Sequence, residues 1–283
     1  MVFLLLTGGE PLLRPDFPEL LHALKNMGFL VSVNSNGSLL RGELLEAVKR
    51  DPPLRFNITL YGGSNAAYER LCGRAMFREV VDNLRALKDA GIPVRLNVSV
   101  TPDNKDDVPE IFRLARELGL HTKASTYMYP PVRLGDGRPG DAPHRFAPED
   151  AARYMLLCRE QQFTLEELRA SAAGVPLSDG DECTGNAEGE PVLCRAGRSS
   201  FWLTWDGRMI PCGMMASPGT PVMEQGFSAA WRSVQTEVEA IRLPAACAGC
   251  ALRRHCNLCA ASCFAETGDY DRKPDYICSL THT

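Results

Sequence analysis

The chain contains no long hydrophobic run at its start and no excess of positive charge. Its first apolar stretch covers residues 2–6 and ends at Thr7, which is too short for the hydrophobic core of a signal peptide or for a membrane span. The 283 residues carry a formal net charge of −4, so charge gives no argument for nucleic-acid binding. We therefore expect a cytoplasmic protein with neither a membrane nor a nucleic-acid partner.

Cysteine is rare in the first part of the chain and abundant near its end. Nine of the 11 cysteines lie between residues 183 and 278. Disulfides are uncommon in the reducing cytoplasm, and thiols at short, mixed spacings are typical ligands of soft metals. The sequence therefore favours metal or cluster ligation over a disulfide framework.

Short apolar runs alternate with helical segments in the first half of the chain. The runs cover residues 2–6, 29–33, 55–60, 94–100 and 123–128. Helical periodicity covers 15–27, 77–90 and 107–118, and a glycine follows each of these segments. Runs that are apolar on both faces, alternating with amphipathic helices, predict an α/β fold with a parallel sheet or barrel covered by helices.

The alternation stops at Pro130. Residues 133–146 are rich in Gly, Pro, Arg and Asp and indicate a loop, and two helices are expected over 148–162 and 164–173. Further on, the aromatic run 201–205 turns at Asp206-Gly207, which predicts a β-hairpin. A helix over 228–241 and the dense cysteine block complete the chain.

The loop Thr7-Gly8-Gly9-Glu10-Pro11 directly follows the first apolar run. Ligands of parallel α/β folds bind at the carboxyl ends of strands, where such loops lie. Paired glycines let a ligand approach the backbone, and Glu10 can pair with an amine. A plain βα turn with an exposed glutamate explains the same five residues equally well.

Residues 6–16, with the sequence LTGGEPLLRPD, resemble the GGEP segment of radical S-adenosylmethionine (radical SAM) enzymes, and residues 33–37 resemble that family's "TNG" turn. The resemblance implies a (β/α)6 barrel in which Glu10 contacts the methionine amino group of S-adenosylmethionine, while Thr7, Gly8 and Gly9 present backbone to it. It also implies further polar contacts to this cofactor from Ser35, Asn36, Thr59 and Asn97.

The CxxxCxxC element of that family does not occur in the 283 residues. In the family it follows strand one and holds the [4Fe-4S] cluster that chelates S-adenosylmethionine. The segment Cys256-x2-Cys259-x3-Cys263 has these spacings in reverse order and is interpreted as a decoy. Because five runs stand where the family has six strands, we expect a partial barrel missing its first β/α unit, in a fragment, a split protein or an inactive homologue.

The later cysteines resemble the SPASM domain, the auxiliary-cluster extension of radical SAM maturases. Its pattern is C-x(9–15)-G-x4-C, then C-x2-C-x5-C-x3-C, then a final cysteine. The chain departs from this pattern at Cys259, which follows Cys256 at x2 instead of x3. The other matching positions are Cys194, Gly207, Cys212, Cys247, Cys250, Cys256 and Cys278.

The SPASM resemblance implies two auxiliary [4Fe-4S] clusters. Cys247, Cys250, Cys256 and Cys278 would hold one cluster. Cys194, Cys212 and Cys259 would hold the other, with a fourth ligand from Cys183, from Cys263 or from no residue of the chain. A free, partly buried thiol is an equally open interpretation of Cys183 and Cys263. On the CxxC spacing alone, a structural zinc site is also open.

Several other conspicuous side chains are interpreted as structural. The sequence assigns no catalytic residue, although Tyr61, Tyr127 and Tyr129 lie near expected strand ends. Cys72 and Cys158 are interpreted as isolated thiols, and Trp202, Trp205 and Trp231 as core packing of a small domain. Arg253, Arg254 and His255 are interpreted as part of a solvated surface.

Together these features predict a partial radical SAM barrel over residues 1–145, a helical linker over 146–190 and a cysteine-rich SPASM domain with a β-hairpin over 191–283. The resemblance implies a peptide or protein maturase that is reduced by a flavodoxin or ferredoxin. It would use S-adenosylmethionine only if the missing N-terminal cluster segment is supplied. The alternatives are a non-catalytic iron–sulfur module for electron transfer or peptide binding, and a zinc-stabilised binding domain.

Overall fold

The computed structural model describes residues 3–131, 137–173, 192, 194–215 and 217–283. Its contacts divide the chain into two compact units. Unit 1 comprises Met1–Thr126 and Tyr154–Phe163, and unit 2 comprises Tyr127–Arg153 and Thr164–Thr283. The domain boundaries at residues 145 and 190 stay a prediction.

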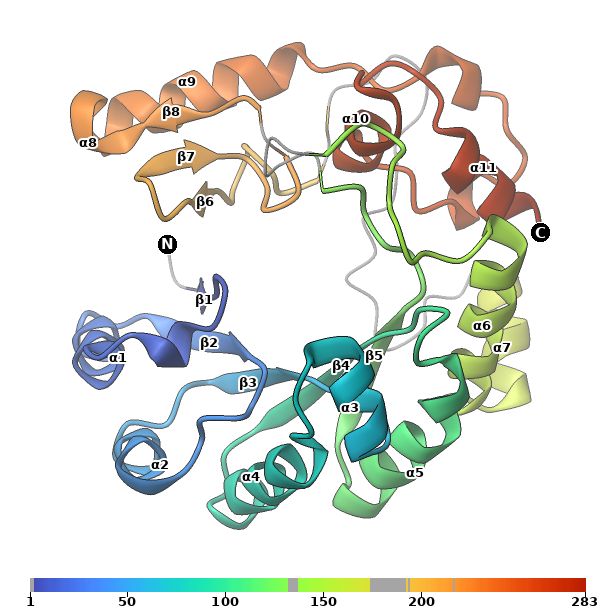
Figure 1. The fold of residues 1–283 in the computed structure, drawn as a ribbon. Helices are drawn as coiled ribbons and strands as arrows, with labels where there is room; N and C mark the ends of the chain where they lie inside the picture. Colours follow the sequence, from blue (N-terminus) through green and yellow to red (C-terminus); the bar gives the residue numbers. More distant parts are fainter. Residues whose placement is uncertain (1–2, 132–136, 174–191, 193, 216) are drawn as a thin grey trace. The chain divides into compact units, whose positions relative to one another are not determined.

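Unit 1 contains a five-stranded parallel sheet, as the alternating pattern predicts (Figure 1). The strands are adjacent in chain order and comprise β1 (Phe3–Leu6), β2 (Leu30–Ser35), β3 (Arg55–Thr59), β4 (Val94–Ser99) and β5 (His121–Ser125). The apolar run expected over 123–128 lies partly beyond β5. The α/β class with a parallel sheet is therefore confirmed.

Helices connect consecutive strands and cover one face of the sheet in Figure 1. They comprise α1 (Phe17–Asn26), α2 (Gly42–Arg50), α3 (Asn65–Cys72), α4 (Phe77–Asp89) and α5 (Val108–Leu118), with the 3-10 turns η1 (Pro11–Leu13) and η2 (Lys105–Asp107). In α5, apolar residues at helical spacing are buried against the sheet, and Gly119 ends the helix with a φ of 63°. The periodicity located α1, α4 and α5 but missed the shorter α2 and α3.

The two faces of the sheet differ in chemistry. Val33 and Ile58 share the helix-covered face and are fully buried, at 0% exposure. On the opposite face, strand register places Asn34 beside Asn57, and Asn57 beside Arg95. The prediction that these runs are apolar on both faces is therefore wrong, because alternate positions of β2, β3 and β4 are polar.

Two helices follow the sheet along the chain, α6 (Pro148–Glu160) and α7 (Leu165–Ala172). Thr164 begins α7 with a capping box: its side chain accepts a hydrogen bond from the backbone of Glu167, whose carboxylate accepts one from the backbone of Thr164. Among the residues that the structure places, no helix combines the length and apolar character of a membrane span.

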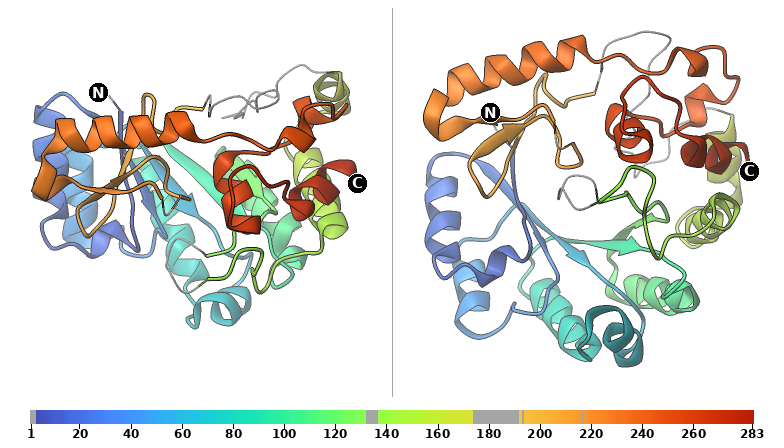
Figure 2. Two further views of the ribbon diagram at one scale, coloured as in Figure 1. Left: turned by 90° about the horizontal axis from the view of Figure 1, so that it is seen from above. Right: turned by 45° about the horizontal axis from the view of Figure 1, so that its top comes forward.

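Unit 2 contains the expected hairpin and a small three-stranded sheet. Strands β6 (Trp202–Leu203) and β7 (Arg208–Ile210) are antiparallel, and β8 (Thr220–Pro221) pairs with β7. Gly207 makes the hairpin turn with a φ of 79°, a backbone conformation that glycine adopts without strain. Helix α9 (Phe227–Ala240) packs on this sheet (Figure 2).

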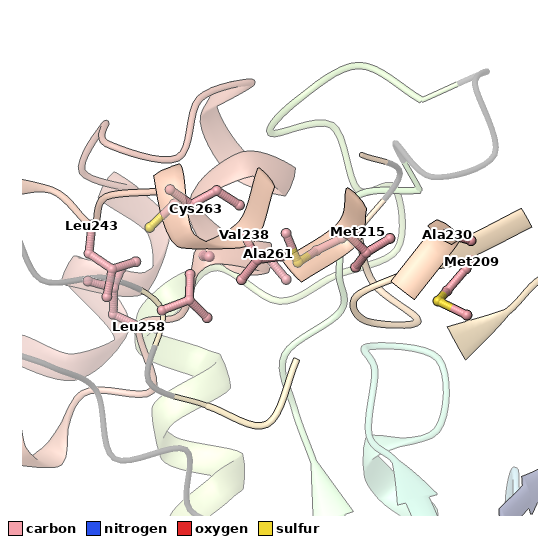
Figure 3. Packing of buried hydrophobic residues seen from close by; sticks show 12 residues of the cluster. Met209, Met215, Ala230, Val238, Leu243, Leu258, Ala261 and Cys263 are labelled. Atoms are coloured by element: carbon pink, nitrogen blue, oxygen red, sulfur yellow. The ribbon is translucent and has the colours of Figure 1, made fainter. Parts of the chain in front are cut away.

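The remaining elements of unit 2 are α8 (Val222–Gln225), η4 (Ala245–Cys247), η5 (Arg253–His255), α10 (Ala260–Thr267) and α11 (Asp275–His282). Residues of α8, η4 and α10 lie in one apolar core or pack against it. Met209, Ala230, Val238 and Leu258 are among the buried residues of this core (Figure 3). Core packing was predicted for three tryptophans, but Trp205 lies at the hairpin turn and is 99% exposed, so that part of the prediction is wrong.

Candidate functional site

The structure brings Glu10, Ser35 and Asn36 together in unit 1. The Glu10 carboxylate accepts hydrogen bonds from Ser35 Oγ at 2.9 Å, from Asn36 N at 2.7 Å and from Leu12 N at 3.1 Å. This arrangement follows from topology, because β1 and β2 are neighbouring parallel strands and their carboxyl ends lie at the same edge. The GGEP loop and the turn after β2 therefore form one site.

This site retains capacity for a cationic ligand. A carboxylate offers about four acceptor positions, and three are occupied at Glu10 by groups of the chain. Gly8 and Gly9 have open space where side chains would project, so a ligand can approach their backbone. The arrangement suits a primary ammonium group held against Glu10.

The turn after β2 has a support that the sequence did not reveal. Buried Asn83 on α4 donates from Nδ2 to the carbonyl oxygen of Gly37 at 2.8 Å. Gly37 has a φ of 75°, and a Cβ there would lie 3.0 Å from Ile58 Cγ2. Ser35 Oγ also accepts from Gly37 N at 3.0 Å. A residue 46 positions away thus fixes the backbone beside Glu10, and no local pattern predicts such a contact.

A row of polar side chains crosses the sheet from the same loop, on the face opposite the helices. Asn34 Nδ2 donates to Thr7 Oγ1 at 3.4 Å, and Asn57 Nδ2 donates to Asn34 Oδ1 at 2.8 Å. Thr59 and Asn97 are register partners one row further along β3 and β4. The candidate cofactor contacts therefore lie at the carboxyl ends of the strands, beside the GGEP loop, and along one face of the sheet.

Unit 2 contains a cavity of about 160 Å³ whose wall includes Cys247, Cys250, Cys256 and Cys278. Cys247 ends η4, Cys256 follows η5, and Cys278 lies in α11. The structure thus brings together the four cysteines that the sequence analysis assigns to one auxiliary cluster. A volume near 150 Å³ is enough for a ligand of benzene size.

The chemistry of this cavity fits an iron–sulfur cluster. Four thiols match the four soft ligands that a cube takes, each at a separate iron. Arg253 and Lys273 line the same cavity and offset the negative charge of bound thiolates. Burial raises the pKa of Cys247, the neighbouring Cys256 raises it further, and Arg253 acts in the opposite direction. The assignment of Arg253 to a solvated surface is therefore wrong, because its half-buried side chain lines the cavity.

A site for a single metal ion is a separate question from a site for a cluster. Within the described part of the chain, no group of three or more His, Cys, Asp or Glu side chains meets the geometry for one metal ion. A cube spreads its ligands over four irons, so its fit is judged from the cavity and its donors.

The other candidate ligands lie around the apolar core of unit 2. Cys194, Cys212 and Cys259 are partly buried and pack against that core. Cys259 also begins α10, where its Sγ accepts a hydrogen bond from Ser262 N at 3.4 Å. Cys183 lies outside the described residues.

Cys263 is a member of the apolar core and is 0% exposed (Figure 3). Burial, reinforced by the neighbouring Cys259, raises its pKa well above the ordinary range of a thiol. Cys158 is also 0% exposed, and burial raises its pKa to about 11. Both environments favour a neutral thiol over a thiolate ligand.

A buried ion pair lies elsewhere in unit 2. Arg145 Nη1 donates to Glu266 Oε1 at 2.7 Å, and these side chains are 15% and 4% exposed. Tyr127, whose position near a strand end drew attention in the sequence, donates from Oη to the same carboxylate oxygen at 2.6 Å. The Tyr276 ring lies 3.9 Å from the Arg145 guanidinium carbon. Burial raises the pKa of Tyr127 far above its usual range, and Glu266 adds to the shift, so its hydroxyl stays a donor.

The parallel β/α sheet, with its Gly-Gly-Glu loop at the strand ends, is the part of the chain that matches a known family model. Residues 2–128 match the family model described as "Radical SAM superfamily". This segment of the chain is therefore similar in sequence to radical SAM domains.

Two known proteins are similar to the chain over segments of different length. It is 25% identical over 293 residues to the AdoMet-dependent heme synthase of Methanosarcina barkeri, a match that covers 96% of this chain and 81% of that protein. It is 34% identical over 132 residues to the probable GTP 3′,8-cyclase of Saccharolobus islandicus. The second match spans 46% of this chain and 42% of the cyclase.

Solved structures share the fold over nearly the whole chain. Native anSMEcpe with bound AdoMet and Kp18Cys peptide superposes with a TM-score of 0.71 at 15% identity, covering 99% of this chain and 81% of that one. Streptococcus suis SuiB bound to precursor peptide SuiA gives a TM-score of 0.69 at 16% identity, covering 98% and 64%. At these identities the likeness shows the fold alone.

Proposed function

We propose that this protein is a radical SAM/SPASM-type iron–sulfur protein that matures a peptide or protein. The observation that carries the proposal is the cavity lined by Cys247, Cys250, Cys256 and Cys278. These four thiols come from segments up to 31 positions apart and share one wall with two cationic side chains. An iron–sulfur cluster, when bound there, supplies one-electron transfer.

The residues of the chain have distinct roles in this proposal. Cys247, Cys250, Cys256 and Cys278 hold one auxiliary cluster. Cys194, Cys212 and Cys259 belong to a second cluster, and the burial of Cys263 argues against it as the fourth ligand.

Unit 1 holds S-adenosylmethionine at the GGEP loop. Glu10 receives the amino group of its methionine part, while the hydrogen bonds from Ser35 and Asn36 keep the carboxylate in place. Thr7, Gly8 and Gly9 provide backbone and polar contacts, and Thr59 with Asn97 contacts the part of the cofactor that lies along the sheet. These residues bind and orient, and no residue is assigned a proton-transfer role.

A peptide is the proposed substrate because solved structures with this fold bind peptides, namely SuiB with SuiA and anSMEcpe with Kp18Cys. A flavodoxin or ferredoxin is the proposed reductant. A tetrapyrrole is the second candidate substrate, favoured by the similarity to a heme synthase over 96% of this chain. Incubation with each class, followed by mass spectrometry of the products, separates the two.

Metal analysis tests the iron–sulfur assignment. We expect iron and acid-labile sulfide in the anaerobically purified protein. In Cys250→Ser, we expect the iron and sulfide contents to fall by the amount that one cluster contains. The matched control is Cys72→Ser, which alters a partly exposed thiol in unit 1. Zinc without iron or sulfide would identify a zinc-stabilised domain and overturn the proposal.

Cleavage of S-adenosylmethionine distinguishes an enzyme from a non-catalytic module. The 283 residues contain no CxxxCxxC element, so we expect dithionite to release 5′-deoxyadenosine only from a version extended by such a segment. In that version, Glu10→Gln should weaken cofactor binding at least tenfold, whereas Glu19→Gln on α1 should not. If the extended version carries all of its clusters but releases no 5′-deoxyadenosine, the result favours the non-catalytic iron–sulfur module over the enzyme.

A further inference from the structure

The cysteine cavity of unit 2 contains donors to sulfur that the sequence did not indicate. Its wall includes Thr281 and His282 in addition to the four cysteines. Both residues lie on α11, three and four positions after Cys278. Residues at these spacings share one face of a helix, so α11 presents a thiol, a hydroxyl and an imidazole to the same cavity.

Thr281 contacts a ligand sulfur directly. Its Oγ1 lies 3.3 Å from Cys256 Sγ and 2.8 Å from the carbonyl oxygen of Ile277. A hydroxyl has one proton, so the two acceptors compete for it. Negative charge on a ligating sulfur favours the bond to Cys256, because hydrogen bonds to charged acceptors are stronger than those between neutral groups.

His282 contacts a second ligand sulfur. Its Nε2 lies 3.7 Å from Cys250 Sγ, and the ring nitrogen that faces a thiolate donates when it carries the proton. Cys250 and His282 are 32 positions apart in the chain. The nearby charges are those of Arg253 and Lys273, and the carboxylate of Asp275 lies 3.9 Å from Lys273 Nζ in a side chain that is 94% exposed.

We propose that Thr281 and His282 tune the auxiliary cluster by donating hydrogen bonds to the sulfurs of Cys256 and Cys250, which raises its reduction potential. Reduction adds one electron to the cluster, and part of its charge resides on the ligand sulfurs. Hydrogen-bond donors and cations around these sulfurs stabilise the reduced form more than the oxidised form. The inference rests on the proposed function, because it requires a cluster in this cavity.

The consequence is a division of roles within α11. Cys278 ligates, while Thr281 and His282 are positioning residues that act through Cys256 and Cys250. The cluster then accepts an electron more readily than it would with the same four thiols in an apolar cavity. Arg253 and Lys273 act in the same direction through their charge.

The test substitutes two positions on α11, with a control at the residue that follows the helix. Thr281→Val removes the hydroxyl beside Cys256 at similar side-chain volume. Thr283→Val is the matched control, because Thr283 Oγ1 makes the same type of bond to the carbonyl oxygen of Ser279, at 3.0 Å, and lines no part of the cavity. His282→Leu removes the second donor, and His282→Gln keeps an N–H donor on a side chain of comparable reach.

The measurement is a redox titration with dithionite, following the electron paramagnetic resonance signal that Cys250→Ser abolishes. Iron and sulfide contents are determined in parallel. We expect Thr281→Val and His282→Leu to retain their cluster and each to lower the ratio of reduced to oxidised cluster about tenfold at a fixed potential, a shift of about 59 mV for one electron. Thr283→Val and His282→Gln should stay near the unaltered protein.

Two results would overturn the inference. A full cluster with an unchanged potential in both Thr281→Val and His282→Leu would remove the tuning role and leave the proposed function intact. Loss of the cluster from these variants alone would assign them to holding the cluster instead of tuning it. Absence of iron and sulfide from the unaltered chain is a separate result, which removes the proposed function itself.

Discussion

At the scale of single residues, Glu10 illustrates how a ligand residue is also a structural residue. Its carboxylate accepts three hydrogen bonds, from η1, from the last residue of β2 and from the turn that follows it. The sequence identified the residue from the GGEP resemblance, but it did not predict these partners. Preorganisation of this kind keeps a charged group oriented before its ligand arrives.

Gly37 provides the first prediction at this scale. Gly37→Ala places a side chain in the left-handed backbone region, 3.0 Å from Ile58 Cγ2, and we expect it to lower the free energy of unfolding by about 1–3 kcal/mol. Gly73→Ala is the control, because Gly73 has a similar φ of 69° but open space around its Cβ position. Urea denaturation of both variants makes the comparison. Equal losses would show that the Ile58 contact contributes nothing.

Cys158 provides a prediction about pH. Burial raises its pKa to about 11 in the folded state, whereas the pKa of an unfolded thiol is near 9.0. Between these values only the unfolded chain loses the proton, so this contribution to stability is complete below pH 9 and is lost as the pH rises towards 11. The loss reaches up to about 3 kcal/mol.

Urea denaturation at pH 8 and at pH 10.5 measures this effect. Cys158→Ala removes the titrating group, so its unfolding free energy should fall less between these pH values than that of the unaltered protein. Burial also raises the pKa of Cys72, but this thiol is only partly buried, so Cys72→Ala should change the pH dependence less than Cys158→Ala does. An unchanged slope in Cys158→Ala would contradict the prediction.

At the scale of elements, the buried pair of Arg145 and Glu266 links α10 to the segment that precedes α6. Glu266→Gln leaves the Arg145 guanidinium without a full negative partner at 15% exposure, so we expect unit 2 to lose about 3 kcal/mol of stability. Glu237→Gln on α9 alters an exposed carboxylate that accepts one bond from Ser233, and should change stability by less than about 0.5 kcal/mol. Chemical denaturation monitored in unit 2 tests this. A loss no larger than that of the control would contradict it.

Periodicity in the sequence was sufficient for some elements and not for others. The helices α1, α4, α5 and α9 have an apolar face repeated over several turns, and their bounds lie within about two residues of the prediction. The helices α10 and α11 are eight residues each and contain the small or polar residues of the cysteine block, so they give no clear period. The sequence did not predict the alternation of β2 and β3, whose polar positions are Ser32 and Asn34 in β2 and Arg55, Asn57 and Thr59 in β3.

The sequence also predicted some residues of the candidate sites and not others. The spacing of the cysteines was enough to group the four that line one cavity. Thr281 and His282 were not predicted, because their contacts depend on how α11 packs against residues more than 20 positions away. Asn83 was missed for the same reason: its partner Gly37 lies on another element. Local patterns identify ligand types, whereas the groups that orient them come from tertiary packing.

At the scale of the whole molecule, the two units contain different candidate sites and should respond differently to cluster binding. A cluster bound by four thiols of unit 2 stabilises the folded form of that unit, because the cavity does not exist in the unfolded chain. We expect stripping the iron with a chelator under oxidising conditions to lower the protection of amide hydrogens mainly in residues 245–282, while β1 to β5 remain protected. Hydrogen–deuterium exchange with peptide-level mass spectrometry measures this directly. The variant Cys250→Ser, Cys278→Ser supplies the control, since stripping should change its exchange in residues 245–282 little. An equal loss of protection across both units would contradict the separation of the two sites.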